Sequence, residues 1–176
     1  MKIGVVSDTH RNTAMLSAVV EWLTTRQGIS LLCHCGDDYG DLRALADSYL
    51  DVLQVPGIYD SGYRDGSIPA KVAETVQGLR LLLVHSREKD LTEAEESAAD
   101  IVLHGHTHRH ELVSRDGRLV MNPGHLKAEI DKQAPATFGC LDIQDRSVTA
   151  VIYNLKHAVV ERMELMRAET GLYRAS

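Results

Sequence analysis

Four groups of side chains able to bind metal occur in this sequence of 176 residues, each directly after a short apolar run. They are Asp8-Thr9-His10, Gly36-Asp37-Asp38, His85 and His104-Gly105-His106-Thr107-His108. Carboxylates and neutral imidazoles together suit Mn, Zn, Fe, Co or Ni, whereas Ca and Mg prefer oxygen ligands. Gly36 and Gly105 let the backbone turn sharply, so that the side chains beside them converge. The pattern predicts a divalent-metal site, and six candidate ligands with a carboxylate able to bridge favour two ions.

The apolar runs that precede these groups alternate with helical patterns. The sequence predicts buried strands at Ile3–Val6, Leu31–His34, Val52–Val55, Leu79–Val84 and Ile101–Leu103. Between the first two strands a helix is predicted from a capping Asn12 or Thr13 to Gly28, because the apolar residues there recur at helical spacing. This alternation is typical of a parallel sheet covered by helices.

After two more helices the pattern changes. One is predicted at Leu42–Leu50, and the other begins at Thr92, which can form a capping box with Glu95. Strands then follow at Leu112–Val113, Leu119–Met121, Phe138–Ile143 and Val148–Tyr153. We therefore predict an α/β domain whose later strands are joined mainly by hairpins. Because the carboxyl ends of parallel strands face one crevice, the metal-binding groups are expected at a single sheet edge.

Each group also has a structural interpretation when it is taken alone. Asp8 could cap the helix that follows it, His85 could be a core histidine, and the alternating histidines from His104 onward could form an exposed tract. Four groups of ligand type in this order are hard to obtain by chance, which favours the metal site. The histidines interpreted as non-ligands are His34, His110, His125 and His157, with His104 in the core or behind the ligands.

The composition argues against several classes of protein. With 19 basic and 25 acidic side chains and a net charge of −6, the chain has the wrong sign for general nucleic-acid binding. Aromatic residues make up only 5%, which argues against a base-stacking surface. No apolar run approaches the ~20 residues of a membrane span. The cysteines Cys33, Cys35 and Cys140 form neither a disulfide framework nor a zinc knuckle, so a cytoplasmic location is expected.

In these motifs the sequence resembles the calcineurin-like metallophosphoesterases, and its length and Asn122-Pro123-Gly124 turn are similar to their small bacterial and archaeal phosphodiesterases. The matching motifs are Asp8-Thr9-His10, Gly36-Asp37, Gly57–Asp60, His85 and Gly105-His106-Thr107-His108. The resemblance covers a domain at residues 1–155 and leaves 156–176 as a C-terminal extension of uncertain structure. It implies an α/β fold, a two-sheet sandwich flanked by helices in four layers, with a binuclear metal site.

The resemblance also implies which side chains hold the ions. Carried over residue by residue, the ligands are Asp8, His10 and His108 for the first ion, Asp37 as the bridge, and His85 and His106 for the second. Ile58 stands where the family has an asparagine ligand of the second ion. Since isoleucine cannot coordinate, the second site is expected to be weaker. Manganese is the expected ion, with Ni, Zn, Fe or Co as options.

The expected function is metal-dependent hydrolysis of a small phosphodiester or phosphomonoester by a metal-bridging hydroxide. Arg11 is a candidate contact for the substrate phosphate, and Tyr59 stands where related chains place a proton-donating histidine. Ile58 favours the alternative, a catalytically weakened or inactive member that serves as a metal-binding or protein-interaction scaffold, as a eukaryotic retromer subunit of this fold is thought to do. A metallo-β-lactamase-like hydrolase would need aspartate at position 107, where this chain has Thr107.

Overall fold

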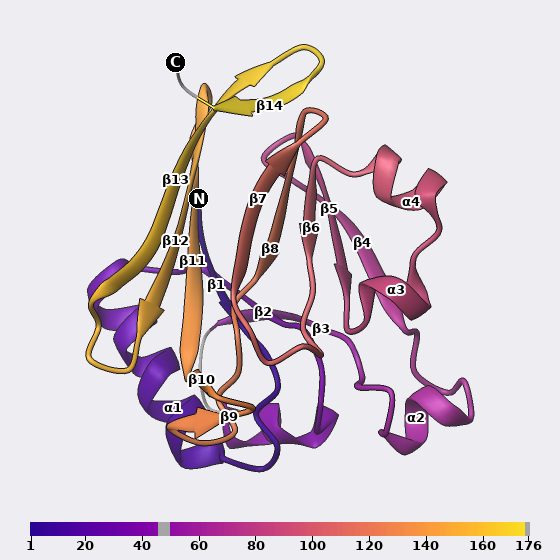
Figure 1. Ribbon diagram of the computed structural model, residues 1–176, viewed down its shortest axis with the longest axis vertical. Coiled ribbons are helices and arrows are strands. Elements are labelled where there is room, and N and C mark those ends of the chain that lie inside the picture. The colour runs from indigo at the N-terminus through magenta and orange to yellow at the C-terminus, as the bar shows by residue number, and fades with distance from the viewer. Residues whose placement is uncertain (46–49, 175–176) are drawn as a thin grey trace.

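Two mixed β-sheets lie face to face in the computed structural model, which describes residues 1–45 and 50–174 (Figure 1). The seven-stranded sheet contains β1 (Lys2–Val6), β2 (Leu31–His34), β3 (Asp51–Gln54), β11 (Thr137–Ile143), β12 (Ser147–Asn154), β13 (Val159–Ala168) and β14 (Gly171–Arg174). The five-stranded sheet contains β4 (Lys71–Val76), β5 (Leu79–Val84), β6 (Ile101–Leu103), β7 (Glu111–Arg115) and β8 (Arg118–Asn122). Their strand orders are β14-β13-β12-β11-β1-β2-β3 and β4-β5-β6-β8-β7. The predicted two-sheet α/β fold is confirmed.

Helices cover the outer faces of both sheets. They are α1 (Thr13–Trp22) with a π-helical turn at Leu23–Gln27, a 3-10 helix at Tyr39–Leu45, α2 (Ser61–Arg64), α3 (Arg87–Asp90) and α4 (Glu93–Ala98). A small hairpin of β9 (Ile130–Asp131) and β10 (Ala134–Pro135) stands apart from the two sheets. None of the described helices is long and apolar enough to cross a membrane.

Alternation along the strands divides the core into layers. In β1, Ile3 and Val5 pack into the apolar cluster between the sheets, together with Leu81 and Leu83 of β5. Val6 joins the cluster under α1 instead. Because successive side chains of a strand point to opposite faces, a buried run such as β1 supplies both layers at once. The core therefore fixes the relative position of the strands that carry the metal-binding groups.

The first helix has the ends that the sequence predicts. The side chain of Asn12 accepts a hydrogen bond from the backbone N–H of Met15, which satisfies one of the free donors at the start of α1. Gly28 ends the following turn at φ +70°, a left-handed conformation that glycine adopts without a steric penalty. The capping box of Thr92 and Glu95 is also present at α4. These caps fix the lengths of the connections that lead to and from the site.

Several parts of the fold differ from the sequence prediction, which also lacks the short elements α2, α3, β9 and β10. The segment predicted as a helix at Leu42–Leu50 is instead covered by a 3-10 helix that ends at Leu45, and its residues 46–49 lie outside the described ranges. Strand β4 was not predicted, since most of its residues are exposed at a sheet edge and it has no apolar run. Residues 156–176, expected as an extension of uncertain structure, supply β13 and β14, whose Leu165 and Leu172 are buried between the sheets.

Candidate metal centre

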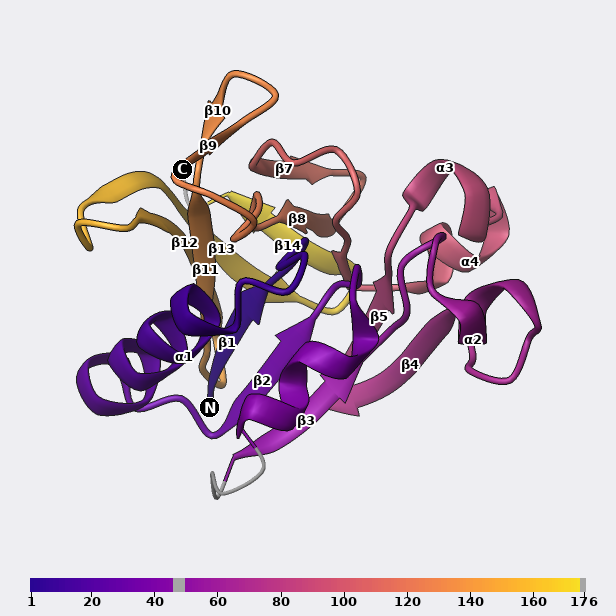
Figure 2. The ribbon, with the colours of Figure 1, turned by 90° about the horizontal axis from the view of Figure 1, so that it is seen from below.

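The metal-binding groups meet at the end of the sandwich where β1, β2, β5 and β6 terminate; Figure 2 views the molecule from this end. Asp8 and His10 follow β1, and Asp37 follows β2. His85 follows β5, while the remaining histidines follow β6. The spacing alone predicts one edge of one parallel sheet. Instead, the first two groups come from the seven-stranded sheet and the last two from the five-stranded sheet.

Four of the six candidate ligands form one compact group. Asp8, His10, Asp37 and His108 each offer a ligand atom, and these atoms all lie within 4.8 Å of one another. Nε2 of His10 lies 3.2 Å from Oδ2 of Asp37 and 3.3 Å from Nε2 of His108. Nitrogen and oxygen atoms that converge in this way match the donor set that divalent transition metals prefer.

The hydrogen bonding of His108 leaves two acceptor atoms facing each other. Its Nδ1 lies 2.5 Å from Oδ2 of Asp131. Because an ionised carboxylate only accepts hydrogen bonds, Nδ1 carries the hydrogen, and Nε2 of the neutral ring offers a lone pair. That Nε2 lies 3.1 Å from Oδ1 of Asp8, a buried atom with no hydrogen-bond partner among the described residues. A cation bound to both atoms removes their repulsion, so the pair fits a metal ion.

His85 repeats this arrangement on the other side of Asp37. Its Nδ1 lies 2.7 Å from the carbonyl oxygen of Cys35, which can only accept, so Nδ1 donates. Its buried Nε2 lies 3.3 Å from Oδ1 of Asp37 and has no hydrogen-bond partner in residues 1–45 and 50–174. The two oxygens of Asp37 thus face different histidines, His10 and His85. This placement suits a carboxylate shared between two ions.

His106, the sixth candidate, lies beside His85 rather than inside the compact group. The two imidazole ring centres are 5.1 Å apart. The backbone N–H of His106 donates to Oδ2 of Asp8 at 3.0 Å, which fixes the loop that carries the ring. Burial, together with the neighbouring His85, lowers the pKa of His106 below its usual value. A neutral imidazole is the form that binds a metal.

Electrostatic interactions shift the pKa values of His10 and Asp37 in opposite directions. A hydrogen bond with Asp37 raises the pKa of His10, although partial burial of the ring acts in the opposite direction. Burial acts to raise the pKa of Asp37, but the hydrogen bond with His10 and the electrostatic interactions with the neighbouring histidines outweigh it, so this pKa lies below its usual value. In the metal-free site the carboxylate is therefore ionised near neutral pH, as a metal ligand must be.

The backbone around the site is held in an uncommon conformation. Positive φ angles occur at five candidate ligands: Asp8 (51°), His10 (45°), Asp37 (63°), His106 (72°) and His108 (63°). Each such residue costs roughly 1–3 kcal/mol, which the rest of the fold must offset, and strain of this kind gathers at functional sites. Glycines make the close approach possible: a Cβ on Gly57 would lie 1.7 Å from Oδ1 of Asp37, and one on Gly105 would lie 2.0 Å from Oγ of Ser7.

No side chain at the third motif replaces the missing asparagine. The side chain of Ile58 is buried, with 8% of its surface exposed. Oδ2 of Asp60 accepts hydrogen bonds from the backbone N–H groups of Gly57 (2.7 Å) and Tyr39 (3.3 Å). Asp60 therefore stabilises the loop and does not take the place of the asparagine ligand.

The two candidate substrate contacts lie at the surface beside the site. The Arg11 side chain is 87% exposed, and its Nε lies 3.3 Å from Oδ1 of Asp38. Tyr59 is 69% exposed, and the guanidinium of Arg64 lies 5.9 Å from the centre of its ring. Both side chains are free to meet a ligand, but neither is held in one orientation by burial.

The structure also adds a residue that sequence reasoning missed. Asp131, on β9, orients His108 and is itself paired with Lys127, whose Nζ lies 3.0 Å from Oδ1. Nothing in the sequence around Asp131 marks it, because its partner is distant in the chain. Among the histidines interpreted as non-ligands, His34 lies 3.2 Å from the Thr9 hydroxyl, and His157 stacks on the ring of Trp22.

Comparisons with known proteins show which family the chain belongs to and which structures share its fold. The family model described as the calcineurin-like phosphoesterase superfamily domain matches residues 1–146. The chain is 23% identical over 170 residues to phosphodiesterase MJ0936 of Methanocaldococcus jannaschii, covering 86% of this chain and 99% of that protein. The structure is similar to Vps29 of Chaetomium thermophilum (TM-score 0.74, 19% identity, 96% and 100% of the two chains). It is also similar to Vps29 of Entamoeba histolytica complexed with zinc (TM-score 0.65, 23% identity, 93% and 99%). The chain belongs to the calcineurin-like phosphoesterase superfamily.

Proposed function

We propose that this protein is a metal-dependent phosphoesterase that hydrolyses a small phosphodiester or phosphomonoester. The observation that carries the proposal is the pair of mutually facing acceptors, Nε2 of His108 with Oδ1 of Asp8 and Nε2 of His85 with Oδ1 of Asp37. Such atoms suit a bound cation, and divalent ions held there would neutralise phosphoryl oxygens and lower the pKa of a water molecule enough for attack near neutral pH. The likeness to a phosphodiesterase supports the same reaction class.

The proposed ligand sets follow the grouping of the side chains. Asp8, His10 and His108 would hold the first ion, Asp37 would contribute one oxygen to each ion, and His85 with His106 would hold the second. The second ion has fewer ligands because Ile58 offers none, so we propose that it binds more weakly. Manganese is the proposed ion; zinc also suits these ligands, and a Vps29 structure of this fold contains it.

The remaining groups of the chain would position the substrate. Arg11 extends into solvent beside Asp38 and would contact a phosphate oxygen, for which its planar guanidinium is suited. The exposed phenol of Tyr59 would donate the proton that the leaving alcohol needs. A phenol is a poor acid near neutral pH, so activated aryl esters, whose leaving groups need no proton, should be hydrolysed fastest.

The test is Mn²⁺- or Ni²⁺-stimulated hydrolysis of bis(p-nitrophenyl) phosphate. The Asp37→Ala variant should lose this activity, because it removes the carboxylate that faces both histidines. Asp116→Asn, which changes an exposed aspartate in the turn between β7 and β8, is a matched control and should retain activity. Unchanged activity in Asp37→Ala would exclude the proposed role of the site.

The second candidate function is a metal-binding or protein-interaction scaffold with weakened or absent catalysis. It is favoured by the buried Ile58 at the position of a missing ligand and by the engagement of Asp60 elsewhere. The Ile58→Asn variant separates the two functions. A large gain in metal content and hydrolysis would support the scaffold for the natural chain, whereas substantial wild-type activity without further gain would support the enzyme.

A further inference from the structure

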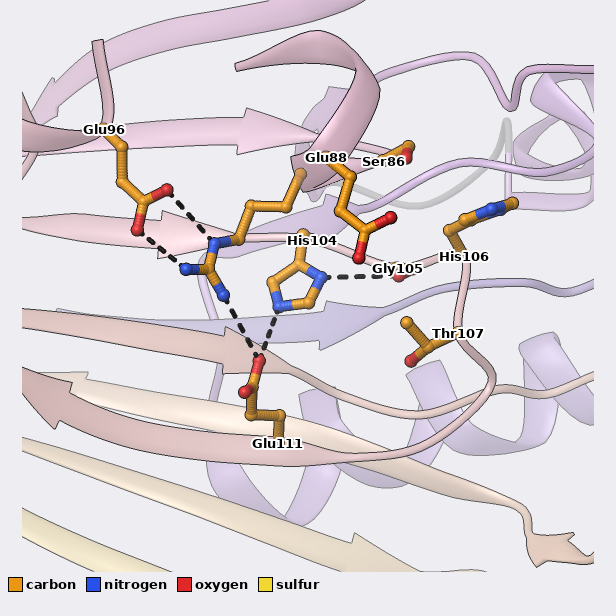
Figure 3. Close-up of a pocket in the computed structure, with 9 residues that line it drawn as sticks. Ser86, Glu88, Glu96, His104, Gly105, His106, Thr107 and Glu111 are labelled. Atoms are coloured by element: carbon orange, nitrogen blue, oxygen red, sulfur yellow. Dashed lines mark hydrogen bonds and ion pairs between the residues drawn. The ribbon is translucent and has the colours of Figure 1, made fainter. Parts of the chain in front are cut away.

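A cleft of about 460 Å³, lined mainly by charged and polar residues, opens beside the metal centre, next to His106 (Figure 3). It is lined by the loop after β6 on one side and by α3 on the other. The lining residues are Ser86, Arg87, Glu88, Glu96, His104, Gly105, His106, Thr107 and Glu111. Because His106 borders both the cleft and the candidate ligands, an ester held at the metal centre can extend one substituent into this space.

The glutamate side chains that line the cleft outnumber its arginine side chain. Its only guanidinium among the lining residues, that of Arg87, forms two hydrogen bonds with Glu96, at 3.2 and 2.9 Å, and its Nη1 lies 3.7 Å from Oε2 of Glu111. Glu111 is also 3.0 Å from Nε2 of His104. These groups form one wall of the cleft, in which the positive charge is already paired. Glu88 adds a third carboxylate, and Figure 3 shows it pointing toward the cleft with no partner among the residues drawn.

The lining also limits what the cleft can hold. Its residues include no phenylalanine, tyrosine or tryptophan, so a nucleobase would find no aromatic ring to stack on other than imidazole. The surplus of carboxylates would repel a second phosphate group. A quaternary ammonium is typically bound by an aromatic cage, which is missing here. A primary ammonium, with three donors and a positive charge, matches the available acceptors.

We propose that this cleft binds the alcohol part of the ester and that Glu88 selects alcohols bearing a primary ammonium group, as in an aminoethyl phosphoester. The inference rests on the proposed phosphoesterase function and adds its substrate class. Glu88 forms a charge-assisted hydrogen bond with the ammonium, while the Arg87–Glu96 and His104–Glu111 pairs hold the walls of the cleft in place.

The test compares two diesters with the same leaving group, p-nitrophenyl 2-aminoethyl phosphate and p-nitrophenyl propyl phosphate, in Mn²⁺ buffer. They differ by an ammonium in place of a methyl group. The wild-type protein should prefer the aminoethyl ester by about tenfold in kcat/KM, the size expected of one partly exposed charged hydrogen bond. In Glu88→Gln the ratio of the kcat/KM values for the two esters should fall toward onefold.

The matched control is Glu169→Gln, which removes one exposed carboxylate from the turn between β13 and β14, at the end of the sandwich opposite the site (Figure 1). It should keep the wild-type preference, because it changes net charge equally but leaves the cleft intact. Equal kcat/KM for the two esters in the wild type, or a preference that survives in Glu88→Gln, overturns the proposal.

The proposal can fail separately from the phosphoesterase function. If neither ester is hydrolysed, the enzymatic function is wrong, and the cleft is then tested by calorimetry with 2-aminoethyl phosphate and propyl phosphate in Mn²⁺ buffer. Tighter binding of the aminoethyl compound that disappears in Glu88→Gln supports the cleft assignment. Equal binding of the two compounds, or no binding of either, overturns it.

Discussion

Replacement of Asp131 should weaken metal binding while leaving the fold intact. Its Oδ2 lies 2.5 Å from Nδ1 of His108 and holds the ring so that Nε2 faces Asp8 and His10. The side chain lies on the β9–β10 hairpin, outside both main sheets, and its other oxygen pairs only with the half-exposed Lys127. Removing it therefore creates no cavity in the apolar core, and its effect should appear in the metal site.

The size of the effect depends on what replaces the carboxylate. Loss of a carboxylate behind a metal-binding histidine typically costs about 10–100-fold in metal affinity, or roughly 1.4–2.7 kcal/mol. Asp131→Asn keeps an oxygen that can accept from Nδ1 of His108 but loses the charge, and neutral hydrogen bonds are roughly half as strong. We therefore expect about tenfold weaker binding for Asp131→Asn and about a hundredfold for Asp131→Ala.

The assay is calorimetric titration of the metal-free proteins with Mn²⁺ and Zn²⁺. Asp116→Asn, in the distant turn between β7 and β8, serves as the matched control and should bind like the wild type. Thermal melts of the metal-free variants should agree within a few degrees, showing that the fold is intact. Wild-type affinity in Asp131→Ala would refute the reasoning, because it would mean that the orientation of His108 does not contribute to the site.

Three further results are expected. Gly57→Ala should abolish metal binding measured by calorimetry, because its Cβ would lie 1.7 Å from a carboxylate oxygen of Asp37. The control Gly40→Ala should bind metal normally, because its Cβ meets nothing within 4 Å. The three cysteine thiols, whose pKa values are raised by burial, should resist a thiol reagent at pH 8 until the protein is unfolded. A hydrogen bond from Lys71 lowers the pKa of Glu95 to about 2. The stabilisation of the fold by the ionised Glu95 is therefore complete above the ordinary glutamate pKa of ~4.3 and disappears as the pH falls toward 2. Glu95→Gln should lower Tm at pH 7 and have little effect on Tm near pH 2.

Elements with a strong local signal could be predicted from the sequence. Strand β6 is a continuous apolar run, strand β5 is apolar except for the exposed Arg80, and α1 has both a capping Asn12 and a terminating Gly28. Strand β4 lacks such a signal because it is an exposed edge strand, stabilised by pairing with β5. The C-terminal strands also lack a clear sequence signal. Strand β13 alternates buried and exposed residues at only a few positions and depends on its hydrogen-bonded pairing with β12.

The candidate site was predictable where its residues follow strands, and not where they act through a distant partner. Asp8 and Asp37 could be predicted because they are carboxylates that follow β1 and β2. The carboxylate of Asp131 meets His108 across 23 residues, and no local pattern encodes that contact. The cleft beside His106 could not be predicted from the sequence either, because its wall depends on the Arg87–Glu96 pair between α3 and α4.

We propose that Asp8, His10, Asp37 and His108 bind a divalent ion. Anomalous diffraction from crystals grown with Mn²⁺ will show whether an ion occupies this group. We predict a strong peak among these four side chains, and a weaker one between Asp37, His85 and His106 because Ile58 contributes no ligand. Crystals of Asp37→Ala should lack the weaker peak. The absence of any peak among the four side chains in the wild-type protein would contradict the claim.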